Sequence, residues 1–266
     1  MVLVWGVSLC CSLTAPLPPD AHPIEPPAIF ARWWAMTEGC SGRTGALAAV
    51  RWYRAPGSSV PIDGVQAAGY WSSRYNRIVL PEEMVDNGLV VRHEMLHALA
   101  RNDTHSRADF LDACASVVDC RGGCVDDGGP WNAPQRDYLV LPPDSLDIAS
   151  EARVLPPESD GQRWVTLLVT VRNSRDRAMV VKAPGDPAAP PTFAFDIRGP
   201  TGGISVADVA RDSSTLFFRP HETKSRLFEF RVSSELTRYH VPTGQLLVRG
   251  AYARRWAAWD TVLVSP

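Results

Sequence analysis

The sequence has no strong excess of charge of either sign and little histidine. Its 266 residues include 27 Lys and Arg, 29 Asp and Glu and six His, for a formal net charge of -2 at pH 7. Such a balance provides no basic face for nucleic acid and no polybasic segment for an anionic membrane surface. We therefore expect no nucleic acid and no membrane surface among the partners of this protein.

Long apolar runs are absent beyond the N-terminus, so no segment there is expected to span a bilayer. Residues 2–13 are apolar apart from two serines, and residues 16–27 are rich in proline. This order is typical of an export signal and a linker, although no Lys or Arg precedes the apolar run. We expect residues 1–27 to direct export, which places the mature protein in the periplasm, at the cell surface or outside the cell. A lipid anchor at Cys10 or Cys11, a misassigned start and a buried terminal strand stay open.

Cysteine is scarce as well. Beyond the apolar segment the sequence contains four cysteines, which are Cys40, Cys114, Cys120 and Cys124. Their spacing lacks the paired Cys-x-x-Cys rhythm of a closed structural zinc site, which favours two disulfides over thiolate ligands. Disulfides agree with export to an oxidising compartment, and four cysteines permit three pairings, which the sequence leaves open.

The region from residue 28 to 145 mixes strand and helix patterns, which predicts a small α+β domain. Short β-rich runs predict three strands, the last two joined by a hairpin at residues 72–76. The strands are expected at residues 47–53, 65–71 and 77–80.

Helical patterns follow these strands. Pro81 and the two glutamates after it suit the start of a helical turn, and Asn87 suits the N-cap of a helix over residues 89–101. Asn102 is a suitable left-handed residue to end that helix. A further helix is expected over residues 107–118, followed by a loop rich in Gly and Asp over residues 121–134.

From residue 150 to 266 the helical period is lost and short β-rich runs alternate with turn residues. Several runs alternate apolar and other residues, as in Phe193-Ala194-Phe195. Regularly spaced strands of this kind predict an antiparallel, all-β sandwich of the immunoglobulin-like sort. The expected strands are at residues 164–171, 178–181, 192–197, 215–218, 227–232, 245–248 and 261–264.

The run His93-Glu94-Met95-Leu96-His97 lies within the predicted helix at residues 89–101. Two histidines four residues apart lie on one helix face, so their imidazoles can converge on one ion. A carboxylate next to the first ligand can reach a water that zinc makes acidic enough to act as a nucleophile near neutral pH. This pattern predicts a mononuclear zinc site with His93 and His97 as ligands.

A catalytic zinc usually has three protein ligands and one open position, so a third ligand must come from outside the helix. His105 is our first candidate, because a short segment after the helix can turn the chain back toward the two histidines. Asp103 is the second candidate and Asp109 the third. The sequence therefore predicts the ligand set His93, His97 and His105.

Residues 90–99, Val-Val-Arg-His-Glu-Met-Leu-His-Ala-Leu, resemble the active-site helix of the zincin metallopeptidases. The resemblance implies a zincin-like domain in which His93 and His97 are zinc ligands and Glu94 is the general base. It covers about a tenth of the chain, and the predicted strand pair before it resembles the edge that holds an extended peptide in zincins. The whole layout also resembles uncharacterised exported bacterial proteins with a small zincin-like domain.

The sequence departs from individual zincin clans. Ala100 stands where metzincins have glycine, and no methionine lies between His105 and Met179 to form their Met-turn. A glutamate ligand of the gluzincin type would have to be Glu151 or Glu158, near the expected domain boundary. The resemblance therefore implies the zincin fold and chemistry without assigning a clan.

Other conspicuous residues are expected to have structural roles. Three tyrosines could stabilise an oxyanion and four tryptophans could offer a carbohydrate surface, but aromatic side chains more often pack. The tyrosines are Tyr70, Tyr75 and Tyr138, and the tryptophans are Trp33, Trp34, Trp256 and Trp259. The remaining histidines, His22, His221 and His240, are expected in the linker, at the surface or at strand ends.

Together these patterns predict an exported, zinc-dependent metallopeptidase that hydrolyses peptides or proteins, with Glu94 as general base. One alternative is a non-catalytic binding or adhesion protein with a structural or vestigial metal site. In another, the β region inhibits the helical domain by masking it. Truncation near residue 150 separates these interpretations, because an inhibitory β region predicts a gain of activity.

Overall fold

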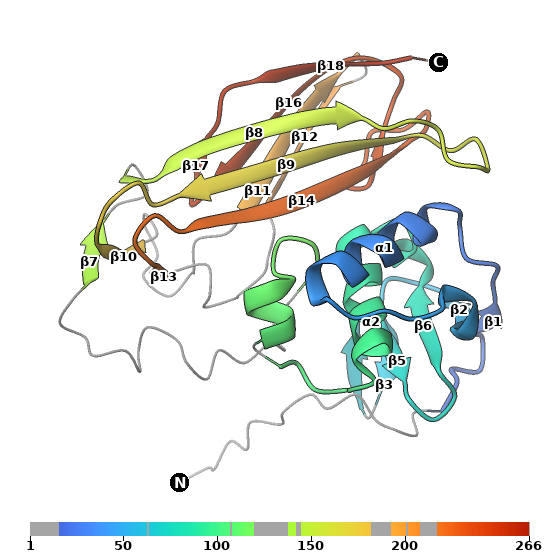
Figure 1. Ribbon diagram of the computed structural model, residues 1–266. Coiled ribbons are helices and arrows are strands. Elements are labelled where there is room, and N and C mark those ends of the chain that lie inside the picture. The colour runs from blue at the N-terminus through green and yellow to red at the C-terminus, as the bar shows by residue number, and fades with distance from the viewer. Residues whose placement is uncertain are drawn as a thin grey trace, which may run out of the picture.

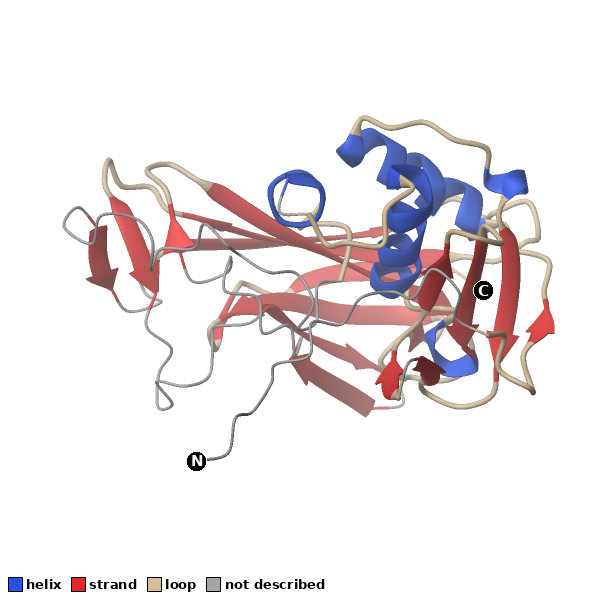
Figure 2. Cartoon of the chain, turned by 90° about the horizontal axis from the view of Figure 1, so that it is seen from below, coloured by secondary structure: helices blue, strands red, loops and turns tan. Residues whose placement is uncertain are grey.

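A computed structural model of the chain describes residues 16–62, 64–106, 108–119, 138–141, 145–181, 193–200, 202–207 and 217–265. It shows a sheet-rich α+β fold, as the sequence predicted at this level. Residues 16–119 carry the long helices and are called the N-terminal part; most of the later described strands form a β-sandwich (Figure 1). Figure 2 shows the helices gathered beside the small N-terminal sheet. Within the described residues, no helix is long and apolar enough to cross a membrane.

The N-terminal part is built on a four-stranded mixed sheet with the order β1-β2-β6-β5. Its strands are β1 (His22–Pro23), β2 (Arg51–Ala55), β5 (Tyr70–Ser72) and β6 (Arg77–Pro81), and a separate hairpin joins β3 (Val60–Ile62) to β4 (Val65–Ala67). The predicted pairing through residues 72–76 is confirmed, since β5 and β6 are antiparallel neighbours. The expected strand at 65–71 is divided in two, because β4 and β5 pair with different partners.

The proline-rich segment expected as a linker makes contacts with this part. His22 and Pro23 pair with Tyr53 and Arg54 of β2. Leu17 and Ala21 pack against a small apolar cluster of the N-terminal part. Because Pro lacks an N–H donor, the proline-rich segment suits an edge position, where strand β1 lies.

Two helices cover this sheet: α1 (Ile29–Ser41) and α2 (Gly88–Ala100). Helix α1 was not predicted from the sequence, although its buried residues recur at helical spacing: Ile29, Phe30, Trp33, Trp34 and Thr37. Both tryptophans are core residues, which confirms packing as their role. The segment expected as a strand at 47–53 begins instead with the 3-10 turn η1 (Leu47–Ala49). A second such turn, η2 (Glu82–Met84), follows β6 as predicted for the residues after Pro81.

The helix expected over residues 107–118 is shorter than predicted. The structure has a π-helical turn, η3 (Ala108–Ala113), followed by irregular chain up to residue 119. Cys114 is joined to Cys40 of α1 by a disulfide, which confirms disulfide use in this protein. Carbonyl groups after Cys114 accept hydrogen bonds from arginine side chains instead of helical N–H groups, so the helix does not continue. The other two cysteines of the predicted set, Cys120 and Cys124, lie outside the described residues.

The sandwich consists of two sheets. One has the order β15-β14-β9-β8, and the other has the order β12-β11-β16-β17 with β18 also paired to β16. The first comprises β8 (Asp147–Val154), β9 (Trp164–Arg172), β14 (Thr223–Val232) and β15 (His240–Val241). The second comprises β11 (Phe193–Gly199), β12 (Gly202–Ala207), β16 (Gly244–Tyr252), β17 (Arg255–Trp256) and β18 (Asp260–Val264).

The two sheets share one apolar core drawn from their inward-facing residues. At Gly250 the sheets approach so closely that a Cβ atom would lie 2.2 Å from a methyl carbon of Val169, so only glycine fits there. A small third sheet at one end joins β7 (Tyr138–Leu141), β10 (Ala178–Val181) and β13 (Phe217–Phe218). All seven predicted strands of this region overlap observed strands, whereas β8, β12, β15 and β17 were not predicted.

Candidate metal centre

Helix α2 presents the histidines from a rigid, buried support. The Asn87 side chain caps the helix by accepting a hydrogen bond from the Val90 N–H at 3.4 Å, as predicted. Arg101, and not Asn102, adopts the left-handed conformation that ends the helix, with φ of 52°. Nearly all residues of α2 are buried, which fixes the direction of the side chains between the two ends.

The three predicted ligands converge. The Nε2 atoms of His93 and His97 are 3.2 Å apart, and the Nε2 atom of His105 lies 2.9 Å from that of His93 and 3.2 Å from that of His97. His105 reaches this position because the chain turns back immediately after α2. The three side chains form a cluster that could hold a metal ion.

The outer ring nitrogens of the two helix histidines are held by backbone carbonyls. His93 Nδ1 contacts the carbonyl oxygen of Asp119, and His97 Nδ1 lies 2.8 Å from the carbonyl oxygen of Asn102. Because a carbonyl oxygen can only accept, each Nδ1 must carry the proton in the neutral ring. The Nε2 lone pairs of both rings therefore point into the cluster, which is the tautomer that a metal ligand needs.

The electrostatics of the cluster disfavour protonated imidazoles. Burial, with the neighbouring imidazoles, holds the pKa of His93 well below its usual value. Burial is also the largest cause that lowers the pKa of His97 to about 3, and it lowers the pKa of His105. Three neutral imidazoles with unprotonated nitrogens are thus available near neutral pH.

Glu94 lies on another side of α2, against strand β5. Its carboxylate packs close to Gly69, where a Cβ atom would lie 3.3 Å from Glu94 Oε1, and it accepts a hydrogen bond from the Trp71 backbone. Among the described residues, Glu94 Oε2 has no hydrogen-bond partner although it is buried. Burial raises the pKa of Glu94 to about 8. Such a carboxyl group can hold or release a proton near neutral pH.

Phe110 of η3 forms an aromatic wall for the three histidines. Its ring centroid lies 4.9 Å from those of His93 and His97 and 5.0 Å from that of His105. Phe110 shares a buried apolar cluster with Leu96 of α2, which indicates that it lies away from the face that carries Glu94. Apart from an apolar residue near the third ligand, no local sequence pattern predicts this contact.

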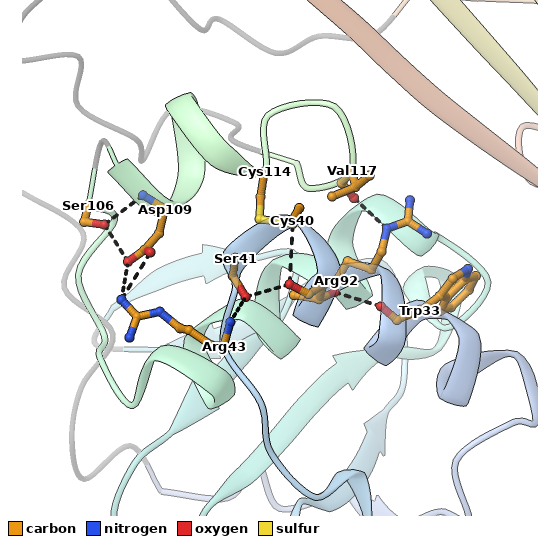
Figure 3. Close-up of a disulfide and its surroundings, with 10 residues drawn as sticks. Trp33, Cys40, Ser41, Arg43, Arg92, Ser106, Asp109, Cys114 and Val117 are labelled. Carbon is orange, nitrogen blue, oxygen red and sulfur yellow. Dashed lines mark hydrogen bonds and ion pairs between the residues drawn. A yellow bond between two sulfur atoms is a disulfide. The ribbon is translucent and has the colours of Figure 1, made fainter.

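The segment that carries Phe110 is joined to α1 by the disulfide and to Arg43, just beyond the end of α1, by an ion pair (Figure 3). Arg43 contacts both carboxylate oxygens of Asp109, at 3.2 and 3.1 Å, and Ser106 Oγ donates to Asp109 Oδ2 at 2.8 Å. Asp109, the third candidate ligand in the sequence, therefore stabilises the segment after His105 and does not join the cluster.

The other alternative ligands also lie outside the histidine cluster found among the described residues. Asp103 acts on His105 only through its charge, which works to raise the pKa of that imidazole. Glu151 pairs with Arg153, and Glu158 pairs with Arg32.

The remaining conspicuous residues make contacts away from the histidine cluster. Tyr70 donates to the Pro16 carbonyl at 3.0 Å, and Tyr75 is an exposed ring that packs with Arg74 and Arg77. The Tyr138 side chain lies outside the described part. Trp256 and Trp259 both pack against the Arg249 guanidinium. The three histidines His22, His221 and His240 contact Arg54, Asp176 and Asp86 respectively.

Comparisons with known proteins place the chain in no family. No protein-family model matches the sequence, and no curated protein matches it. One similar solved structure is the Northeast Structural Genomics Consortium target SoR45, with 13% identity and a TM-score of 0.28 over 46% of this chain and 88% of that one. Another is a Bordetella pertussis protein provisionally named ApaA, with 14% identity and a TM-score of 0.26 over 46% of this chain and 94% of that one. At these TM-scores the likeness supports no inference about the site.

Proposed function

We propose that the protein is an exported, zinc-dependent peptidase in which His93, His97 and His105 hold the metal and Glu94 is the general base. The observation that carries the proposal is the mutual approach of three Nε2 atoms at 2.9 to 3.2 Å. At least two of them direct lone pairs into the cluster, because their Nδ1 atoms are held by carbonyls. Facing lone pairs repel one another unless a cation lies between them.

The spacing of the nitrogens suits zinc. Imidazole nitrogens bind zinc at about 2.0–2.1 Å, so two of them at a tetrahedral angle lie about 3.3–3.4 Å apart. The spacing in the cluster is only slightly shorter. In the part of the chain that the structure describes, no fourth side chain joins the three histidines. Three histidines correspond to a catalytic site with an open position, whereas structural zinc sites use four ligands.

When bound, zinc supplies an electrophile that lowers the pKa of water to about 7 and polarises a carbonyl oxygen. The protein contributes the proton transfers. Glu94 Oε2 accepts a proton from the attacking water and donates it to the leaving amine, and its buried position keeps it from competing hydrogen bonds. In this proposal residues 28–145 are a zincin-like domain, residues 150–266 are an immunoglobulin-like sandwich, and the substrate is a peptide or protein.

Export is supported by two independent features. Residues 2–13 have the apolar composition of a signal segment, and the disulfide between Cys40 and Cys114 is typical of an oxidising compartment. A mass spectrum of the protein secreted from a bacterial host tests this part, because export by a cleaved signal predicts loss of the first residues from the mature protein. A full-length protein retained in the cytosol contradicts it.

Metal content tests the metal centre. The purified protein, loaded with zinc and dialysed, is expected to retain about one zinc per chain by elemental analysis. His105→Ala should lose most of this zinc, while Asp103→Ala should retain it. His221→Ala is the matched control, because that histidine is exposed and pairs with Asp176 away from the cluster. Full zinc retention in His105→Ala contradicts the ligand set.

Activity is tested separately with Glu94→Gln. This variant should bind zinc as the wild type does, yet cleave casein or a peptide library about 10²–10⁴-fold more slowly, the range typical of a lost general base. Equal cleavage by the zinc-loaded variant removes the assigned base. If the zinc-loaded wild type cleaves no peptide, the non-catalytic binding or adhesion alternative is favoured.

A further inference from the structure

Strand β14 of the sandwich binds the turn at residues 115–119, which lies next to the metal centre. The Arg226 guanidinium is buried, and its Nη1 atom donates to the carbonyl oxygens of Ala115 at 2.8 Å and Val118 at 2.6 Å. The backbone N–H of Leu227, the next residue on β14, donates to the Ser116 carbonyl at 3.0 Å. Three carbonyls of one turn are thus bound by the sandwich.

Helix α2 binds the same turn from its other side. Arg92 Nε donates to the Val117 carbonyl at 2.6 Å, and the N–H of Asp119 donates to the Leu89 carbonyl at 3.0 Å. Residues 115–119 make no strand ladder, so these donors fix the conformation of the turn. The next carbonyl of the turn, that of Asp119, is the one that contacts His93 Nδ1.

We infer that Arg226 is a positioning residue of the metal centre, which acts on His93 through the turn at residues 115–119. A carbonyl on the outer ring nitrogen of a ligand sets both the tautomer and the ring orientation. Arg226 binds the carbonyls of Ala115 and Val118, the latter directly before Asp119, so its guanidinium holds the Asp119 carbonyl in line with His93. The sandwich therefore completes the metal centre.

The side of α2 that contacts the sandwich also argues against the alternative in which the β region inhibits the helical domain by masking it. Arg92 contacts Glu229 of β14, and Arg92 and Glu94 are two residues apart on α2, so they point to different sides of the helix. The sandwich thus approaches the side of α2 away from the general base. A masking domain would have to cover the side that carries Glu94.

The inference rests on the metal-binding half of the proposed function and is independent of peptide hydrolysis. In the full-length protein, Arg226→Met keeps the apolar stem and removes the donors. Competition with a chromophoric chelator should show a zinc affinity about 10–100-fold below wild type, the range for loss of a group behind a metal ligand. The Co²⁺-loaded variant should show a shifted d–d absorption spectrum. Arg231→Met, on the same strand but paired with Asp86, is the matched control and should bind like wild type.

Two further measurements keep the test decisive. Arg226→Lys is the second variant, used in case Arg226→Met fails to fold. Because lysine retains a charged donor, this variant should have a zinc affinity between those of wild type and Arg226→Met, and the Co²⁺ spectrum of the wild type. Nitrogen-15 NMR of the metal-free proteins should show His93 protonated at Nδ1 in wild type and a mixture of tautomers in Arg226→Met. If the wild-type protein has no zinc affinity, the proposed function fails. The effect of Arg226 on His93 is still tested, because the His93 tautomer is measured in metal-free protein. Wild-type affinity and tautomer in a folded Arg226→Met variant overturn the inference.

Discussion

The sandwich and the N-terminal part satisfy their buried polar groups in different ways. In the sandwich, long antiparallel ladders pair the backbone and the shared core is apolar. In the N-terminal part, residues 115–119 have no ladder, and side chains from α2 and β14 bind their carbonyls. A regular sheet therefore serves as the rigid support, and its few buried charges fix the irregular turn at residues 115–119 beside the metal centre.

The largest effect is expected where a buried ion pair joins the two parts. Arg92 and Glu229 contact each other with side chains that are 0% and 1% exposed. Glu229→Leu leaves the Arg92 charge buried without its partner, so we expect the free energy of unfolding to fall by about 3–5 kcal/mol. Urea denaturation followed by tryptophan fluorescence measures this change.

A double variant distinguishes a lost pair from lost packing. Arg92→Met combined with Glu229→Leu removes both charges, so it should be more stable than Glu229→Leu alone. Glu235→Leu, an exposed substitution beyond the end of β14, should change stability by no more than about 0.5 kcal/mol. A loss below about 1 kcal/mol in Glu229→Leu means that water reaches the pair and that the two parts are joined by other contacts.

The sequence predicted the parts of the site that depend on local periodicity. His93, Glu94 and His97 share a helix whose cap and length follow from neighbouring residues, and His105 follows after a turn too short to carry it far. The contacts made by Phe110 and Arg226 depend on tertiary packing over long sequence separations, which no local pattern encodes. Helix α1 is a different case, because its buried residues recur at helical spacing, a local pattern from which this helix is predictable.

The second-largest effect is expected at the disulfide of the N-terminal part, a kind of bond that the described strands of the sandwich lack. The disulfide between Cys40 and Cys114 closes a loop with a sequence separation of 74. Replacing both cysteines with alanine should lower the free energy of unfolding by about 2–4 kcal/mol, because the unfolded chain gains freedom. Urea denaturation with and without dithiothreitol measures it, and the reductant should lower the stability of the wild type more than that of the double variant. Equal stability of oxidised and reduced wild type would falsify the expectation.

The two kinds of titrating group in the metal centre predict opposite pH trends for the metal-free protein. The pKa of Glu94 is raised by burial from 4.5 to about 8, so the folded state binds the extra proton and stability falls as pH rises through that window. The pKa of His97 is lowered by burial from 6.5 to about 3, so the unfolded state binds the extra proton and stability rises with pH there.

At pH values well above the usual histidine pKa, unfolded imidazoles no longer bind protons, so of these two trends the fall in stability caused by Glu94 remains. Urea midpoints of metal-free protein should therefore decrease as pH rises through the value of about 8 for Glu94, a range in which free imidazoles, with a pKa of 6.5, bind almost no protons. The change should be on the order of a few kcal/mol at most. Glu94→Gln should flatten this decrease, and bound zinc should reduce it, because a nearby cation favours the ionised carboxylate. A decrease of the same size in Glu94→Gln assigns the trend to another group.

The smallest effect is expected where the sandwich supports the start of α2. The Asn87 side chain caps the helix, and its Nδ2 atom also donates to Tyr239 Oη at 3.2 Å. Tyr239→Phe removes that acceptor and should lower the free energy of unfolding by about 0.5–1.5 kcal/mol. Asn87→Ala should lower it by about 1 kcal/mol through loss of the cap. If the tyrosine acts by orienting the cap, the double variant loses less than the sum of the two single losses, whereas additive losses mean that α2 is capped independently of the sandwich.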